Sequence, residues 1–322
     1  MAENKVYIMQ DSQIRDTITD AAMCIDWVKE SFLMKDDAQL PAKISVHPAD
    51  EDFFTSMPCL LPGKYGRFGI KEVYRILGRK PSLGSDILLY DSHKGDLLAM
   101  MDGDRITMMR TGAVAALAIR LFKKSGADTY SLMGLGNTAR AVALALIADN
   151  RGQKVHFRLL RYKDQAELFV ERFRDCEGVT FEIIDDMDTF ISGADVIVSC
   201  VTAAGGGLFC ADDTKFREGV LLVPVHTRGF QNCDLFFDKV FGDDTGHVCG
   251  FKYFDRFREF HEISDVLAGR CAGRTDDKER IISYNIGIGL HDVLFASKIF
   301  DMADKQQLQC VSIDREDKKF WI

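Results

Sequence analysis

The middle of the chain repeats one pattern, an apolar strand followed by a turn and a helix, and this pattern constrains the fold most. Apolar runs typical of strands lie at 129–133, 154–159, 180–184, 195–199 and 220–223. Helical patterns separate the first three runs, at 137–149 and 165–174. Strands that are apolar along their whole length and alternate with helices are buried on both faces. The sequence therefore predicts an α/β fold with a parallel sheet that is covered on both sides.

The turn after the first of these strands has a glycine pattern. Residues 131–140 read SLMGLGNTAR, which is G-x-G-x-x-A between a strand and a helix. Gly134 permits the tight turn, Gly136 lets the backbone approach a pyrophosphate, and the small Ala139 lets the helix pack against the strand. Free N–H groups at the start of the helix bind phosphates. We therefore predict a dinucleotide site formed by the residues of this turn: Gly134, Leu135, Gly136, Asn137, Thr138 and Ala139.

The end of the second strand, where such a site contacts the cofactor's ribose, carries cations. An NAD site usually offers Asp or Glu there, whereas this chain has Arg161, with Lys163 close by. A guanidinium suits a 2′-phosphate. These residues favour NADP(H) over NAD(H). Two alternatives stay open: Arg161 is a solvated loop charge, or Asp164 reaches the ribose.

The first third of the chain has a different pattern. One amphipathic helix is predicted over 11–34, because apolar residues recur there at steps of three and four. A helix is predicted from Thr111 and a long helical pattern covers 276–303. A glycine-containing loop at 92–95 is typical of a hairpin. A mostly antiparallel sheet is predicted from short β-type runs at 43–46, 53–57, 68–77, 86–91 and 97–101.

Two cations stand out in this sheet region. Lys71 lies in the middle of a predicted strand, and Arg110 lies where the last strand meets the next helix. Two cations beside a cofactor site can hold a substrate carboxylate. Taken alone, each is more often a surface cation whose aliphatic stem covers apolar neighbours.

Composition limits the class of protein. Of the 322 residues, 47% are apolar and 28% are charged, which gives enough apolar surface for a folded core. The net charge of −8 opposes binding to nucleic acid and to anionic membranes. No apolar run reaches the ~18 residues that cross a bilayer, and the first residues lack the apolar stretch of a signal peptide. We expect a soluble, cytoplasmic protein with neither nucleic acid nor membrane as partner.

Neither the cysteines nor the acidic runs indicate a metal. The nine cysteines include no C-x-x-C pair, so we expect reduced thiols that pack as small apolar residues. The runs at 185–188 and 243–244 have no His or Glu at ligand spacing. They are expected to be acids at helix N-termini and in solvated turns.

Several segments together resemble the ornithine cyclodeaminase/μ-crystallin family. The main block is MDG at 101–103, Ile106-Thr107 and RTGA at 110–113, followed by the Gly134-x-Gly136 turn. Further matches occur in the family's order over nearly the whole chain, at Met57-Pro58, the Lys71 strand, Gly273-Arg274-Thr275 and 286–292.

The resemblance implies a fold and an activity. The fold is a Rossmann-type parallel sheet domain, at 116–276, inserted into a split α+β substrate-binding and dimerisation domain, at 1–115 plus 277–322. The chain is then expected to form a homodimer. Members of the family are NAD(P)-dependent enzymes that act on a small α-amino or imino acid by hydride transfer at Cα. The outcome is cyclodeamination, amino-acid dehydrogenation or imine reduction. The alternative is a non-catalytic NADPH- and ligand-binding protein of the μ-crystallin type.

The resemblance also implies roles for individual residues. Lys71 and Arg110 hold the substrate α-carboxylate, and Lys43 stands where the family has a third cation, an Arg. Lys71 is in addition a catalytic candidate. Arg to Lys keeps the charge but loses the planar fork. Met57 is placed at the substrate, and the cofactor is expected to contact Thr111, Thr202 and Val223.

The chain departs from the family after the fifth strand of the parallel sheet. Without a gap, His226 occupies the place of the family's acid/base Asp. Histidine titrates near neutrality and can move a proton at this step. Its other interpretation is a hydrogen-bonded residue that shapes the pocket. Arg228 is a candidate substrate contact.

Overall fold

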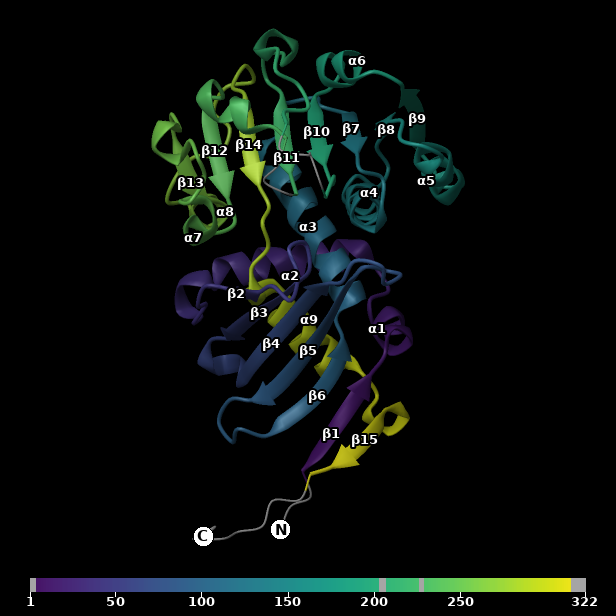
Figure 1. Ribbon diagram of the computed structural model, residues 1–322, viewed down its shortest axis with the longest axis vertical. Helices are drawn as coiled ribbons and strands as arrows, with labels where there is room; N and C mark the ends of the chain where they lie inside the picture. The colour runs from purple at the N-terminus through teal and green to yellow at the C-terminus, as the bar shows by residue number, and fades with distance from the viewer. Residues whose placement is uncertain (1–3, 203–206, 226–228, 314–322) are drawn as a thin grey trace. The chain divides into compact units, whose positions relative to one another are not determined.

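A computed structural model describes residues 4–202, 207–225 and 229–313 (Figure 1). The chain divides into two compact units. The first consists of Met1–Thr19, Met34–Thr107 and Gly289–Ile322, and the second of Asp20–Leu33 and Met108–Ile288. The predicted α/β fold, with one parallel sheet and a second sheet that is mixed, is confirmed. The domain boundaries at 115/116 and 276/277 stay a prediction, and the two units divide the chain at other residues.

The second unit is built on an eight-stranded sheet of order β13-β12-β14-β11-β10-β7-β8-β9. All the pairings in it are parallel, and the arrows of β7, β10, β11, β12 and β14 point the same way in Figure 1. Every residue of β10, β11, β12 and β14 is buried, so both faces of the sheet centre are covered. The strands are β7 (Thr129–Met133), β8 (Val155–Leu160), β9 (Val179–Ile184), β10 (Val196–Ser199), β11 (Leu221–Pro224), β12 (Lys239–Gly242), β13 (Phe260–Glu262) and β14 (Ile281–Tyr284).

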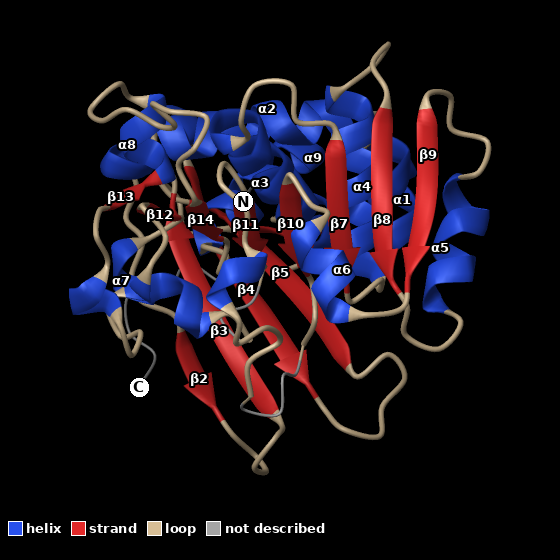
Figure 2. Ribbon diagram, turned by 90° about the horizontal axis from the view of Figure 1, so that it is seen from above, coloured by secondary structure: helices blue, strands red, loops and turns tan. Residues whose placement is uncertain are grey.

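The order of these strands creates a switch point. The chain runs outward from β7 through β8 to β9, which lie side by side in Figure 2. It then returns to the other side of β7 and continues through β10 and β11. Ligands of open α/β sheets bind outside the carboxyl ends of the strands where the order reverses. By this rule, a ligand of this fold would bind at the carboxyl ends of β7 and β10.

Most helices of the second unit connect strands that follow one another in the chain. Helix α2 packs against α4 and α8. Helix α3 begins in the first unit and continues into the second. The helices are α2 (Ala21–Leu33), α3 (Asp104–Phe122), α4 (Asn137–Asp149), α5 (Gln165–Phe173), α6 (Met187–Ser192), α7 (Thr245–Val248) and α8 (Ile263–Leu267). The 3-10 turns are η3 (Asp213–Lys215), η4 (Gln231–Leu235) and η5 (Phe254–Arg256).

The first unit is built on a seven-stranded sheet of order β15-β1-β6-β5-β4-β3-β2. Only β1 and β6 pair in parallel among the described strands of this sheet. The strands are β1 (Lys5–Met9), β2 (Ile44–Val46), β3 (Phe53–Leu60), β4 (Arg67–Arg75), β5 (Leu83–Asp91), β6 (Leu97–Asp102) and β15 (Gln309–Ser312). Its helices and 3-10 turns are α1 (Asp11–Thr17), η1 (Lys35–Asp37), η2 (Gly63–Tyr65), α9 (Gly289–Met302) and η6 (Lys305–Gln307).

Helix α9 lies on this sheet, against β3, β4 and β5. A Cβ at Gly69 of β4 would lie 2.9 Å from Val293 of α9, so the glycine lets the helix approach the strand closely. The hairpin between β5 and β6 is as predicted, with Gly95 at φ +75°.

Two predicted helices were wrong. The single helix expected over 11–34 is two helices, α1 and α2, which belong to different units. The helical pattern over 276–303 contains the strand β14 before α9 begins. A short apolar run such as Ile281-Ile282 fits a buried strand as well as a helix. Gly287, at φ +91°, then separates the strand from the helix.

Candidate functional site

The glycine turn between β7 and α4 has the geometry of a dinucleotide loop. Gly134 has φ +72°, and a Cβ on it would lie 2.6 Å from backbone atoms of Cys200 and Val201. A side chain at Gly134 would therefore collide with the chain leaving β10. Ala139 is fully buried, as its predicted role in helix packing requires.

Gly136 faces outward, in contrast to Gly134. No atom among the described residues lies within 4 Å of the position a Cβ would take on Gly136. The residue is the N-cap of α4, and both it and Asn137 are exposed. The first backbone N–H groups of a helix have no partner within the helix, and the helix dipole places positive potential there. The turn thus presents open backbone and hydrogen-bond donors to an anion, which fits the pyrophosphate of a dinucleotide.

Arg161 lies beyond the end of β8 and is held by two carboxylates. Its Nε is 2.5 Å from Asp185 Oδ1, and its Nη1 pairs with Glu167. The hydrogen bonds to Asp185 and Glu167 raise the pKa of Arg161 above its ordinary value. Lys163 adopts φ +53°, with its Nζ 5.3 Å from the Tyr162 ring centroid. A phosphate at this place would have to share Arg161 with the two acids.

Arg110 is buried in the second unit, with 6% of its surface exposed. Gly287 lies against its guanidinium, since a Cβ on Gly287 would be 2.5 Å from Arg110 Nη1. The Gly287 N–H donates to the carboxylate of Asp243, which is fully buried. The solvated turn predicted at Asp243 is therefore wrong. Glycine at 287 leaves the space that the Arg110 side chain occupies.

Lys71 of β4 forms a buried ion pair in the first unit. Its Nζ is 2.7 Å from Asp292 Oδ2 of α9, and the two side chains are 1% and 0% exposed. Met57 of β3 is the register partner of Lys71 and is 5% exposed. Two buried charges compensate each other only when they stay paired, because the loss of one partner costs about 3–5 kcal/mol. Asp292 therefore fixes the place of the Lys71 ammonium.

The remaining predicted site residues lie at several places. Lys43 and Thr202 are exposed, and Val223 is fully buried in β11. Thr111 lies on α3, next to Arg110. The predicted acid/base residue His226 and the predicted substrate contact Arg228 lie outside the described residues.

The structure contains a third buried carboxyl that the sequence did not reveal. Asp234 of η4 is 1% exposed and accepts a hydrogen bond from the Tyr284 hydroxyl. Burial raises the pKa of Asp234 to about 7, although the Tyr284 hydrogen bond acts to lower it. Asp234 also lines a pocket. A carboxyl that has a raised pKa and lies at a pocket is a candidate functional group.

The structure also bears on the expectations for the cysteines, the acidic runs and the membrane. Burial raises the pKa of Cys200 to about 12, so this thiol is protonated and unreactive at neutral pH. Asp186 caps the start of α6 by accepting from the Thr189 N–H, as predicted for an acid at a helix N-terminus. Across residues 4–202, 207–225 and 229–313, no group of three His, Cys, Asp or Glu side chains is arranged to hold a metal ion. Among the same residues, no helix has the length and apolar character to span a bilayer.

The chain is similar to known proteins over most of its length. It is 27% identical over 279 residues to the nodulation efficiency protein NfeD of Rhizobium meliloti, covering 82% of this chain and 84% of that protein. It is 25% identical over 239 residues to a delta(1)-pyrroline-2-carboxylate reductase of Bacillus cereus, covering 70% of this chain and 73% of the reductase.

A solved structure shares the fold. The delta(1)-pyrroline-2-carboxylate reductase of Thermococcus litoralis, in complex with NADH and L-proline, superposes with a TM-score of 0.82 at 18% identity. The match covers 96% of this chain and all of that one. The sequence model that describes the ornithine cyclodeaminase/mu-crystallin family matches residues 5–307 of this chain, which confirms the resemblance found in the sequence. The chain belongs to the ornithine cyclodeaminase/mu-crystallin family.

Proposed function

We propose that this protein is an NAD(P)-dependent enzyme that transfers a hydride at Cα of a small α-amino or imino acid. The observation that carries the proposal is the Gly134–Gly136 turn, placed at the switch point of a parallel sheet and at the N-terminus of α4. The Bacillus cereus relative, named a delta(1)-pyrroline-2-carboxylate reductase, supports an imino acid as the substrate class.

The residues of the turn would hold the cofactor. The open backbone at Gly136 and the first N–H groups of α4, from Asn137 and Thr138, would bind the pyrophosphate. When bound, the nicotinamide supplies or accepts the hydride. Leu135, the residue between the two glycines of the turn, is buried.

Lys71 and Arg110 are proposed to bind the substrate carboxylate. Both are buried: Asp292 lies 2.7 Å from Lys71 and positions its ammonium, and Gly287 leaves room for the Arg110 guanidinium. A preorganised cation loses little side-chain entropy on binding, and a guanidinium can hold a carboxylate by two hydrogen bonds. His226 is proposed as the acid/base residue, because imidazole titrates near neutral pH.

The proposal includes a preference for NADP(H) over NAD(H). It is supported by Arg161 beyond the end of β8, the place where the ribose of a dinucleotide is contacted. Asp185 and Glu167 hold Arg161 at this edge, so the guanidinium is oriented before a phosphate binds.

A homodimer is also part of the proposal. Strand β2 forms one edge of the first unit's sheet, and its side chains Ile44 and Val46 are 67% and 60% exposed. An exposed apolar edge strand is a surface that a second chain can cover. Light scattering on the purified chain measures the mass, and a monomer at micromolar concentration contradicts this part.

The experiment that tests the function uses the full-length chain and both reduced cofactors. Delta(1)-pyrroline-2-carboxylate is the first substrate, and loss of absorbance at 340 nm is the expected result. A panel of L-amino acids with NAD⁺ and NADP⁺ covers the reverse reaction. Ammonia released from L-ornithine without net cofactor change indicates cyclodeamination instead. Tight cofactor binding with neither signal across the panel refutes an enzyme and favours a binding protein.

A further inference from the structure

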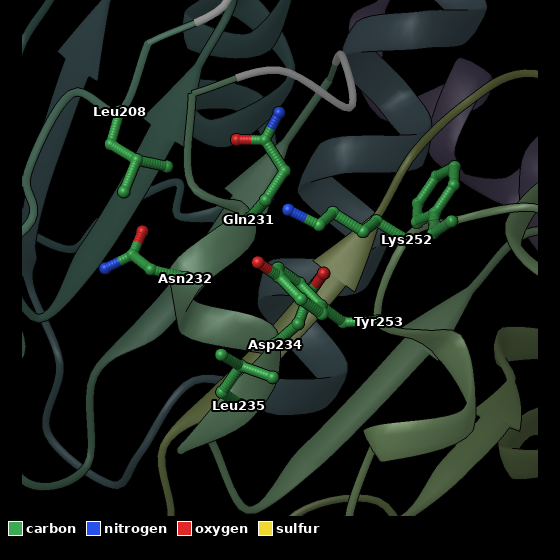
Figure 3. Close-up of a pocket in the computed structure, with 8 residues that line it drawn as sticks. Leu208, Gln231, Asn232, Asp234, Leu235, Lys252 and Tyr253 are labelled. Carbon is green, nitrogen blue, oxygen red and sulfur yellow. The ribbon is translucent and has the colours of Figure 1, made fainter.

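The second unit contains a pocket that the proposed function does not use. It lies against η4 and the segment 251–253, and its volume is about 460 Å³ (Figure 3). Pockets for small ligands measure about 300–1,000 Å³. A molecule of amino-acid size therefore fits it.

A buried carboxyl lines the pocket. Asp234 is 1% exposed, and its Oδ1 accepts from the Tyr284 hydroxyl. Within the part of the chain that the structure describes, no cation lies within ion-pair distance of this carboxyl. Burial without a cation raises the pKa of Asp234 to about 7. The deep part of the pocket thus offers an acceptor whose ionised form has no positive partner among the residues that the structure describes.

A cation lines the same pocket at its exposed side. Lys252 is exposed, and its Nζ lies 4.9 Å from the centroid of the Tyr253 ring. The attraction between an ammonium and an aromatic face favours this position. Figure 3 shows the Lys252 side chain reaching over the pocket, whereas Asp234 lies deeper.

Apolar side chains form part of the wall. Leu208, Leu235 and Phe251 line the pocket together with the two charged residues. Phe251 is held by an edge contact to Tyr284, with ring centroids 5.0 Å apart. The same tyrosine therefore orients both the buried carboxyl and part of the apolar wall.

We propose that this pocket binds a free apolar α-amino acid as a zwitterion, through residues other than those proposed for catalysis. The ammonium of the ligand pairs with Asp234, its carboxylate faces Lys252, and its side chain packs against Leu208, Leu235 and Phe251. All the residues involved belong to the second unit, and none is among the proposed cofactor or substrate residues. The inference does not depend on the proposed function.

Calorimetric titration of the full-length chain with L-leucine, L-methionine and L-phenylalanine tests the proposal. We expect at least one of them to bind, and Asp234→Asn and Lys252→Met each to weaken that binding by about tenfold or more, as for hydrogen bonds to charged groups. Asp234→Asn keeps the acceptor for Tyr284, and Lys252 is exposed, so both variants should fold; circular dichroism verifies this. If none of the three amino acids binds, or if either variant binds like the wild type, the proposal is wrong.

Two comparison ligands and one control variant locate the binding. 3-Methylbutylamine lacks the carboxylate of leucine and 4-methylpentanoate lacks its ammonium, so both should bind at least about tenfold more weakly than L-leucine. Equal binding of either one refutes a zwitterion site. Arg110→Met alters the proposed substrate site and should leave binding at this pocket intact. Loss of all amino-acid binding in Arg110→Met, with none in Asp234→Asn, places the ligand at the substrate site and overturns the inference.

Discussion

The replacement Asp234→Asn should stabilise the protein at alkaline pH. In the folded state the pKa of Asp234 is about 7, against an ordinary value of 3.8. Between these two values the folded state keeps a proton that the unfolded state has lost. A rise in pH through this range therefore favours unfolding of the wild type. Asparagine has no proton to lose and still accepts from Tyr284, so the variant should escape this loss.

The size of the effect follows from the two pKa values. The gap between 3.8 and about 7, at about 1.4 kcal/mol per pKa unit, corresponds to a loss of about 4 kcal/mol in the free energy of unfolding. About 2.5 kcal/mol of it falls between pH 5 and pH 8. The difference in stability between Asp234→Asn and the wild type should therefore grow by about this amount over that range.

Urea unfolding at pH 5, 6, 7 and 8 measures the difference. Tryptophan fluorescence, measured in a background with Trp321→Phe so that Trp27 alone contributes, follows the second unit, because Trp27 is buried there on α2. Asp255→Asn, at an exposed aspartate, is the matched control and should follow the wild type at each pH. Tyr284→Phe removes the hydrogen bond that lowers the pKa of Asp234, so the pH-dependent loss should move to higher pH. Parallel curves for Asp234→Asn and the wild type from pH 5 to pH 8 would refute the reasoning.

Three further predictions test the proposed function and the buried pair. Arg161→Asp should lower the ratio of kcat/KM for NADPH over NADH about tenfold or more; an unchanged ratio contradicts the NADP(H) preference. Arg110→Met should raise KM for an imino acid more than Arg110→Lys, which keeps the charge but not the fork; equal KM values argue against carboxylate binding. Asp292→Asn leaves the buried Lys71 without its counter-ion and should cost about 3–5 kcal/mol in urea unfolding; a loss under about 1 kcal/mol contradicts this account.

The dinucleotide turn was predictable because its residues are fixed by local backbone geometry. Gly134 needs a positive φ and a close approach to the chain after β10, and both requirements are visible as a glycine at that spacing. Helix α4 has the predicted bounds, Asn137–Asp149, since a glycine precedes it and good helix formers fill it. The site roles of these residues stay predictions.

The edge strands and β14 were not predictable in the same way. Strand β14 pairs with β11 and β12, and β13 pairs with β12, so their partners lie outside their local sequence. The run Ile281-Ile282 is too short to show a period. Tertiary pairing, and not a local pattern, makes it a strand.

The buried carboxyls were missed for a different reason. The residue type alone does not show that an aspartate is buried, and acids are most often solvated. Asp243 follows a buried strand and resembles a turn residue, yet it is fully buried beneath the Gly287 N–H. The sequence around Asp292 gave a weak indication that this residue is buried, because it lies among the apolar residues Leu290, Val293 and Leu294 of α9. A charge in a helix that is apolar on all sides has to find a buried partner.

Asp292 and Asp234 show what a buried carboxylate requires. Both are at most 1% exposed, and Asp292 has the ammonium of Lys71 at 2.7 Å. Asp234 has only the neutral hydroxyl of Tyr284 among its described partners, and its pKa rises to about 7. A ligand ammonium in the pocket would give Asp234 a positive partner, as Lys71 does for Asp292. The ionised Asp234 carboxylate should then stabilise the protein when an amino acid is bound and destabilise it when the pocket is empty. Saturating L-leucine should therefore reduce the difference in stability between Asp234→Asn and the wild type at pH 8.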